Sequence, residues 1–140
     1  MKMISSIFMI TLLLQPPASF AVSATSVDEC TANGQAGMRA CLEKKSQESA
    51  IDLALAEKDV MATLARWDED PKYLASARSA FKQSSKSFIT FRQDRCAFAA
   101  SLGGGAIGNA LALRQLACLT DVNRVQAASL RAAVATLPER

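Results

Sequence analysis

The stretch FITFRQDRCAFAASLGGGAIGNALALRQLAC, residues 88–118, decides how this chain folds. It places Cys96 before a run of three glycines and Cys118 after it. Apolar residues recur at helical spacing on both sides of the glycines, and glycine favours turns because it has no Cβ atom. The pattern predicts two helices that meet at residues 101–108 and are pinned near their junction by the cysteines.

The helix before the glycine loop is predicted to run from about Lys72 to Ala99. Its large apolar residues step mostly by three, four or seven positions, which places the aromatic side chains on one face. The members of this face are Leu74, Ala77, Phe81, Phe88, Phe91 and Phe98. The other face carries Lys72, Arg78, Lys82, Lys86 and Arg95. We expect the aromatic face to pack inward.

A helix of about 30 residues is predicted earlier in the chain, because neither Gly nor Pro interrupts the segment from Met38 to Trp67. Its inward candidates are Met38, Cys41 or Leu42, Ile51, Leu55, Met61 and Leu64. The acidic residues Asp68, Glu69 and Asp70 end this helix, and Pro71 is well placed to open the next one. The segment before it, from Asp28 to Gly37, is polar and turn-rich.

The last helix is predicted from about Asn109 to Ala135, followed by a frayed tail at residues 137–140. Its inward candidates are Leu113, Leu116, Val122, Val125, Leu130 and Val134, and its solvated face carries Arg114, Arg124 and Arg131. No stretch alternates polar and apolar residues for long enough to form a strand. The fold predicted is therefore all-α, with three long helices in an up-down-up bundle.

Residues 1–24 are predicted to be a secretory signal peptide. Lys2 precedes an uncharged apolar run over residues 4–14, and small residues follow up to Ala24. The run is too short to span a bilayer, which needs about 20 residues. No cysteine directly follows it, as a lipoprotein cleavage site would require. We expect residues 25–140 to form one soluble helical domain, periplasmic or secreted, without a stable membrane anchor.

The chain has four cysteines: Cys30, Cys41, Cys96 and Cys118. An even number in a small exported chain predicts two disulfides. A zinc site is disfavoured because no pair has C-x2-C spacing and the chain has no histidine, so no metal and no cofactor is expected. Folding the chain about residues 68–71 favours Cys41–Cys96 with Cys30–Cys118. Folding about residues 102–106 favours Cys96–Cys118 with Cys30–Cys41, which we prefer because both loops are local.

The composition argues against catalysis and against nucleic-acid binding. Without histidine, the commonest general base and most catalytic triads are missing, so we expect no enzyme and assign no catalytic residue. Removal of Lys2 with the signal peptide leaves 15 basic and 13 acidic residues, a net charge of about +2. This charge is too small and too evenly mixed for a nucleic-acid partner.

Three features are candidates for binding a partner: the acidic turn (Asp68, Glu69 and Asp70), Arg92, and the glycine loop (Gly103, Gly104 and Gly105). For Arg92 we favour a structural ion pair with an acid of the first long helix, such as Asp52, over contact with a partner. The glycines lack the Gly-Lys-Ser/Thr of a phosphate loop, so we favour a connector that needs positive φ.

Motifs along the chain carry a family resemblance. They are Cys30, Met38-Arg39-Ala40-Cys41, Asp52-Leu53-Ala54-Leu55, the run from Phe88 to Cys96, Gly103-Gly104-Gly105, and Cys118-Leu119-Thr120 with Arg124. In this order the sequence resembles the lysozyme inhibitor LprI-like N-terminal family of small exported bacterial domains. The resemblance implies a periplasmic or secreted helical domain, with lysozyme inhibition ascribed to some members.

The resemblance makes a protein the expected partner, with a lysozyme-type cell-wall hydrolase as the leading target. Two other interpretations stay open: an immunity protein against a periplasmic toxin, and a structural or stress-related envelope protein with no enzyme target. Lysozymes are typically basic, and a complementary acidic surface speeds association. A net charge of about +2 offers no such surface overall. We therefore expect contact at the acidic turn or at the glycine loop.

Overall fold

The computed structural model describes residues 25–105 and 109–140, and these residues are almost entirely helical. The elements are α1 (Ser26–Cys30), the 3-10 helix η1 (Thr31–Asn33), α2 (Gly34–Arg66), α3 (Pro71–Ser101) and α4 (Ala110–Val134). The predicted signal peptide, residues 1–24, lies outside the described residues. None of the helices described is both long and apolar enough to cross a membrane.

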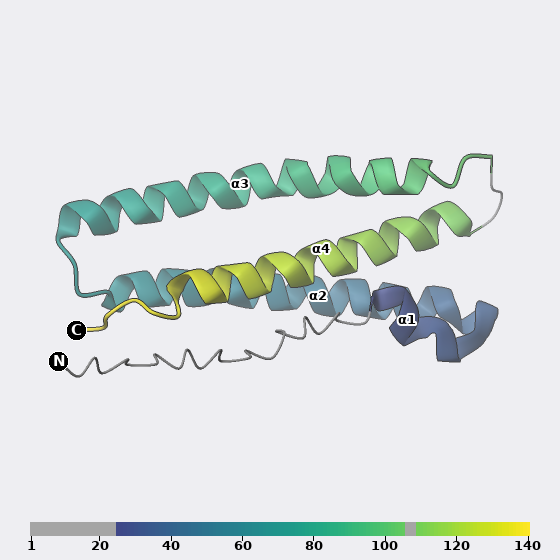
Figure 1. Cartoon of the computed structure of the whole chain (residues 1–140), viewed down its shortest axis with the longest axis horizontal. Coiled ribbons are helices and arrows are strands. Elements are labelled where there is room, and N and C mark those ends of the chain that lie inside the picture. The colour runs from purple at the N-terminus through teal and green to yellow at the C-terminus, as the bar shows by residue number, and fades with distance from the viewer. Residues whose placement is uncertain (1–24, 106–108) are drawn as a thin grey trace, which may run out of the picture.

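The three long helices run up, down and up, as predicted (Figure 1). Helix α4 packs most extensively on α2 and less on α3, whereas α2 and α3 touch each other least. The short α1 folds back against the first turns of α2 and against α4. The core is therefore built mainly between α2 and α4, and α3 lies on it as an outer helix.

Local sequence explains where α3 begins and ends. The Asp70 side chain accepts a hydrogen bond from the Lys72 backbone N–H at 2.8 Å, and Pro71 occupies the first turn, where no N–H is needed. At the other end, Gly104 has a φ of +56°. A Cβ atom on Gly103 would lie 2.4 Å from Leu111 Cδ2. The predicted connector with positive φ is confirmed at Gly104, whereas Gly103 is favoured by its close approach to Leu111.

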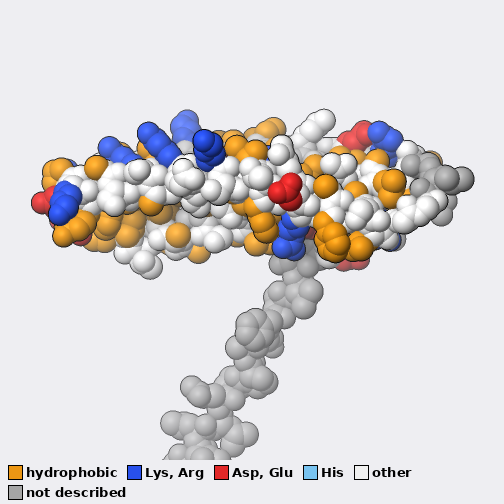
Figure 2. Space-filling model, turned by 90° about the horizontal axis from the view of Figure 1, so that it is seen from above, with side chains coloured by type: hydrophobic (Ala, Val, Ile, Leu, Met, Phe, Trp, Pro, Cys, Tyr) orange, Lys and Arg blue, Asp and Glu red, His pale blue; other side chains and the backbone are white. Residues whose placement is uncertain are grey.

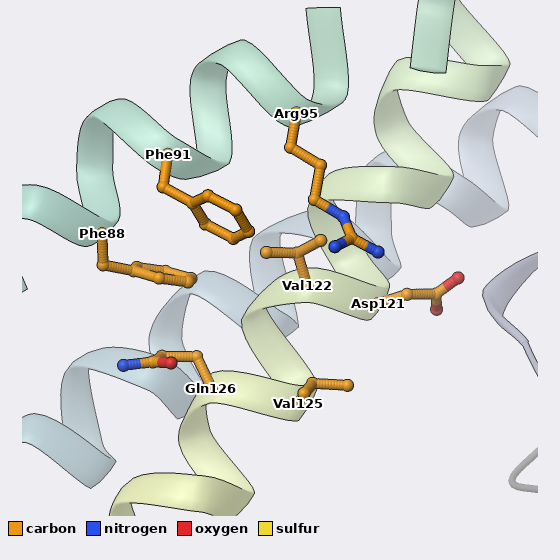
Figure 3. A pocket seen from close by; sticks show the side chains of 7 residues that line it. All are labelled: Phe88, Phe91, Arg95, Asp121, Val122, Val125 and Gln126. Carbon is orange, nitrogen blue, oxygen red and sulfur yellow. The ribbon is translucent and has the colours of Figure 1, made fainter. Parts of the chain in front are cut away.

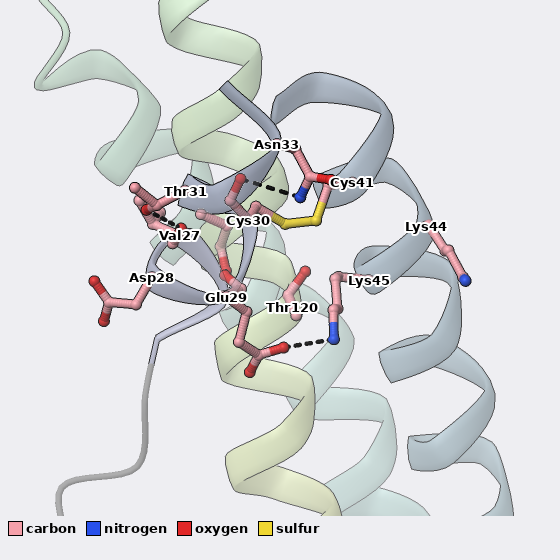
Figure 4. The surroundings of a disulfide bond; sticks show 12 residues. Val27, Asp28, Glu29, Cys30, Thr31, Asn33, Cys41, Lys44, Lys45 and Thr120 are labelled. Carbon is pink, nitrogen blue, oxygen red and sulfur yellow. Dashed lines mark hydrogen bonds and ion pairs between the residues drawn. A yellow bond between two sulfur atoms is a disulfide. The ribbon is translucent and has the colours of Figure 1, made fainter. Parts of the chain in front are cut away.

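Both disulfides have the pairing that we preferred. The Sγ atoms of Cys30 and Cys41 are 1.98 Å apart, and those of Cys96 and Cys118 are 2.05 Å apart. Cys30 and Cys96 are fully buried. Figure 4 shows the first bridge, which ties α1 and η1 to the start of α2. The second bridge ties the C-terminal part of α3 to α4.

The segment that was predicted as a polar turn, residues 28–37, contains the end of α1, all of η1 and the first residues of α2. Thr25 and Asp28 form a reciprocal cap, in which each side chain accepts a hydrogen bond from the backbone N–H of the other. Ser26 is buried, and its N–H donates to the Asp121 carboxylate on α4 at 3.0 Å. A helix of five residues is too short to show a helical period, which is why the turn prediction was wrong here.

The inward face predicted for α2 was wrong in its middle. Ile51 and Leu55 are 63% and 51% exposed, whereas Leu53 and Ala56 are buried. Ala56 and Ala127 of α4 are both fully buried and belong to one core cluster. Two alanines let the helix backbones approach closely, and this contact orients α2 with its bulkier Ile51 and Leu55 outward.

The tail predicted to fray is instead bound to the end of the bundle. The Asp68 N–H donates to the Pro138 carbonyl at 2.9 Å, and the Arg140 N–H donates to the Arg66 carbonyl at 3.0 Å. The Arg66 guanidinium also pairs with the Glu139 carboxylate at 3.1 Å. These partners are 70 to 74 residues apart in sequence, so no local pattern predicts them.

Two arginines of α4 that were predicted to be simply solvated hold other elements in place. Arg124 donates to both carboxylate oxygens of Glu29, at 2.6 and 3.0 Å. Lys45 of α2 also pairs with Glu29, at 2.6 Å (Figure 4). Arg131 pairs with Asp52 of α2 at 2.6 Å. Glu29 therefore joins α1 to both helices of the core.

The Glu29 carboxylate is expected to make stability depend on pH on the acid side. Hydrogen bonds from Arg124, then from Lys45, lower the pKa of Glu29 from 4.5 to about 2. Since the folded state favours the ionised form, this stabilisation is fully present above pH 4.5 and is lost as pH falls through about 2. Solvent screening limits it to about 1 kcal/mol. As pH falls from 4.5 to about 2, the free energy of unfolding measured with urea should decrease less for Glu29→Gln than for the natural protein. Parallel pH profiles of the two proteins would contradict this role of Glu29.

Candidate protein-binding surface

A chain of polar side chains fixes α3 against the other two long helices. Arg92 Nη1 donates to Asn123 Oδ1 on α4 at 2.8 Å. Asn123 Nδ2 donates to Ser49 Oγ on α2 at 3.1 Å, and the Ser49 hydroxyl donates to the Ser46 carbonyl at 2.8 Å. Asn123 and Ser49 are buried. This polar chain crosses all three helices about two-thirds of the way along α3.

The structure gives Arg92 a structural contact, but the suggested partner was wrong. Asp52 is engaged by Arg131, and Arg92 bonds to the neutral Asn123 instead. The Arg92 guanidinium also lies 5.8 Å from the centre of the Phe88 ring. Its Nε atom is buried and has no hydrogen-bond partner within the described part of the chain. The Arg92 side chain is therefore part-buried between the helices, and its guanidinium relies on Asn123 as a hydrogen-bond acceptor.

Sequence reasoning missed Asn123 and Ser49. A usable signal existed for Asn123, because it shares the inward face of α4 with the buried residues Ala117, Thr120 and Ala127 at steps of three and four. A polar residue at an inward position requires a hydrogen-bond partner. Which partner it finds depends on how the helices cross.

An apolar groove of about 260 Å³ lies between α3 and α4. Its lining residues are Phe88, Phe91, Arg95, Asp121, Val122, Val125 and Gln126. In Figure 3 both phenylalanine rings extend from α3 toward α4, and Arg95 reaches past Val122 toward Asp121. The Phe88 and Phe91 ring centres are 6.1 Å apart. This groove joins aromatic and aliphatic surface from two helices.

The aromatic face of α3 is only partly covered, contrary to prediction. Phe88 is half-buried, whereas Phe91 and Phe98 are 51% and 65% exposed. Val125 on α4, also predicted to face inward, is 70% exposed. The reason is the packing of α3, which meets α4 along one side and barely touches α2. A row of large apolar side chains consequently remains accessible beside the groove.

The acidic turn lies at one end of the bundle and has an ordered backbone. All three acids are exposed. Glu69 accepts a hydrogen bond from the Asp70 N–H at 2.9 Å, and Arg140 donates to the Glu69 carbonyl at 2.9 Å. Within residues 25–105 and 109–140, no group of three or more Cys, Asp or Glu side chains is arranged to hold a metal ion.

The structure does not bring the predicted binding features together. The acidic turn joins α2 to α3 at one end, and Gly103, Gly104 and Gly105 follow α3 at the opposite end (Figure 1). Helix α3, which separates them, is about 46 Å long. Arg92 lies between them in the bundle wall. One small partner surface cannot contact all three, so they represent separate candidate sites.

Comparison with known proteins places the chain in a family. The family model described as lysozyme inhibitor LprI matches residues 28–130. This range contains α2, α3, most of α4 and all four cysteines. No curated protein and no solved structure matches the chain. Because the family model covers well over half of its length, the chain belongs to the lysozyme inhibitor LprI family.

Proposed function

We propose that this protein is exported and acts by binding and inhibiting a lysozyme-type cell-wall hydrolase. The observation that carries the proposal is the family match over residues 28–130. Two disulfides fit an oxidising compartment such as the periplasm or the exterior. Export would follow from the signal peptide predicted at residues 1–24.

The exposed apolar side chains support a protein as the partner. Phe91, Phe98 and Val125 are each at least half exposed and lie on two neighbouring helices. Contiguous apolar surface of this kind commonly marks an interaction site. The polar chain through Asn123 and the disulfide at Cys96 fix the helix that carries it, so little conformational entropy would be lost on binding.

For a basic hydrolase we propose the acidic turn as the point of approach. Asp68, Glu69 and Asp70 are contiguous and exposed, and the bound tail keeps their backbone in place. By contrast, α3 carries six Lys and Arg residues and one acid, and would repel a basic enzyme. Opposite charges raise the association rate, and like charges disfavour the wrong orientation. The glycine loop at the other end is the alternative point of contact.

The proposal is tested by a lysozyme assay. The oxidised protein is titrated against a c-type lysozyme that clears a cell-wall suspension, with a g-type enzyme in parallel. We expect inhibition of at least one enzyme with an apparent Kd of about micromolar or tighter. Absence of inhibition of both enzymes at much higher concentrations would overturn the proposal and would favour the toxin-immunity or structural interpretations.

Neutralising the acidic turn is expected to weaken inhibition by about tenfold, mainly through slower association. The variant is Asp68→Ser, Glu69→Ser and Asp70→Ser combined, and serine at 70 preserves a helix-capping side chain. The matched control removes three negative charges elsewhere, by Glu48→Gln, Glu57→Gln and Asp94→Asn. Both variants are compared by stopped-flow binding. Equal behaviour of the two would eliminate the acidic turn as the contact while leaving inhibition itself intact.

A further inference from the structure

Positive charge is concentrated on α3. The helix contains Lys72, Arg78, Lys82, Lys86, Arg92 and Arg95, against a single acid, Asp94. Its net charge is therefore +5, although residues 25–140 together carry only about +2. Elsewhere, α1 carries −2, the acidic turn −3 and α4 +2, whereas α2 and the tail are neutral. Helix α3 is thus the most positive element of the domain.

The cations of α3 form no ion pair within the described residues. The salt bridges there join α1, α2, α4, the acidic turn and the tail to one another. Helix α2 pairs Arg39 with Glu43 and Lys44 with Glu48, four residues apart. At the same spacing α3 places Arg78, Lys82 and Lys86, all of one sign. Like charges four residues apart destabilise a helix, so folding does not account for this pattern.

The four-residue spacing places Arg78, Lys82 and Lys86 along one edge of α3, which we call the basic edge. Lys86 lines a groove of about 490 Å³ between α3 and α2, and Glu57 is the acid on the opposite wall. Lys82 and Lys86 are exposed. Figure 2 views the molecule from the α3 side and shows blue Lys and Arg side chains in a row along one edge.

We propose that the basic edge docks this protein onto an anionic phospholipid membrane. The cations from Lys72 to Lys86 are spread over about 21 Å of helix rather than gathered in a pocket. Mobile lipid headgroups adjust to such a linear, convex array, and each Lys or Arg near an anionic membrane adds to binding. An acidic protein would instead need fixed carboxylates in matching positions.

An exposed apolar side chain beside the basic edge fits the same surface. Ile89 follows Lys86 by three residues, lines the same groove and is half exposed. A helix with basic residues and accessible aromatic or aliphatic side chains is suited to the headgroup region of a bilayer, where both kinds of group are stabilised. This inference does not depend on lysozyme inhibition, because it concerns a different side of the molecule from the acidic turn.

The test is sedimentation of the full domain with vesicles. The probes are vesicles of phosphatidylcholine alone and vesicles of phosphatidylcholine and phosphatidylglycerol in equal parts. We expect binding to the second kind only, and loss of that binding at high salt. Lys82→Gln with Lys86→Gln should weaken it by about thirtyfold, from the contribution typical of two lysines at such a surface. Far-UV circular dichroism checks that the variant stays helical.

The matched control is Lys44→Gln with Lys58→Gln, which removes the same charge from exposed positions on α2. It should weaken vesicle binding by less than about threefold. Equal losses in the two variants would overturn the assignment to the basic edge. Absence of binding to phosphatidylglycerol vesicles at low salt would overturn the proposal. Tighter binding to soluble polyglutamate than to vesicles would also overturn it, in favour of an acidic protein partner.

Discussion

Replacing Cys96 and Cys118 by alanine is expected to lower the free energy of unfolding by about 3 kcal/mol. The bridge closes a loop between residues 22 apart, and its loss increases the conformational entropy of the unfolded chain. It is also the disulfide that attaches α3 to α4. Non-covalent packing of α3 is limited, because Leu74 and Cys96 are its only buried residues. Since domains of this size have about 5–15 kcal/mol of stability, the loss is a large fraction of the total. Urea unfolding followed by circular dichroism measures it.

The matched variant removes the other bridge, by Cys30→Ala with Cys41→Ala. It closes a loop between residues only 11 apart, so we expect a somewhat smaller loss. Hydrogen exchange distinguishes the two sites: opening of α3 amides should accelerate only in the first variant. Stability within about 0.5 kcal/mol of the natural protein would contradict the role assigned to the Cys96–Cys118 bridge.

The substitution Asn123→Ala is expected to cost about 3 kcal/mol, because it removes the group that bonds both Arg92 and Ser49. The part-buried guanidinium of Arg92 would lose its remaining side-chain acceptor, and its Nε already lacks a partner within the described residues. Urea unfolding gives the change in free energy. Gln126→Ala is the control, since it truncates an amide on the rim of the groove, where it should cost no more than about 0.5 kcal/mol.

A double-mutant cycle separates the lost hydrogen bonds from the lost volume. Combining Asn123→Leu with Arg92→Met replaces both partners by apolar side chains. This should lower the free energy of unfolding much less than leaving one partner without its hydrogen bond. The double variant should therefore be more stable than Asn123→Leu alone. Additive effects of the two substitutions would show that Arg92 and Asn123 are not energetically coupled.

Local sequence predicts most of the helical architecture because its signals act over a few residues. Asp70 and Pro71 mark the start of α3, and the uninterrupted segment before them predicts the end of α2 to within one residue and its start to within four. The glycine loop separates α3 from α4, and the cysteines on either side of it pair as preferred. These features depend on capping, on proline and glycine geometry, and on short loops.

The surface that carries the candidate sites was harder to predict. The helical spacing of the large apolar residues in α3 identifies an aromatic face, but it does not predict how much of that face a neighbouring helix covers. Phe91 and Phe98 stay exposed because α3 meets α4 along one side and barely touches α2. Likewise, buried Ala56 rather than larger Leu55 faces α4, because close packing of two alanine surfaces outweighs side-chain hydrophobicity there.

The sequence by itself determined the three long helices, their order, the presence of two disulfides and the motifs of the lysozyme inhibitor LprI family. Only the tertiary structure decided which polar groups meet: Arg92 with Asn123, Arg131 with Asp52, Glu29 with Lys45 and Arg124, and the tail with the acidic turn. The reason is physical. Helix formation is governed by neighbours within one or two turns, whereas these pairs are 16 to 95 residues apart and depend on how whole helices pack.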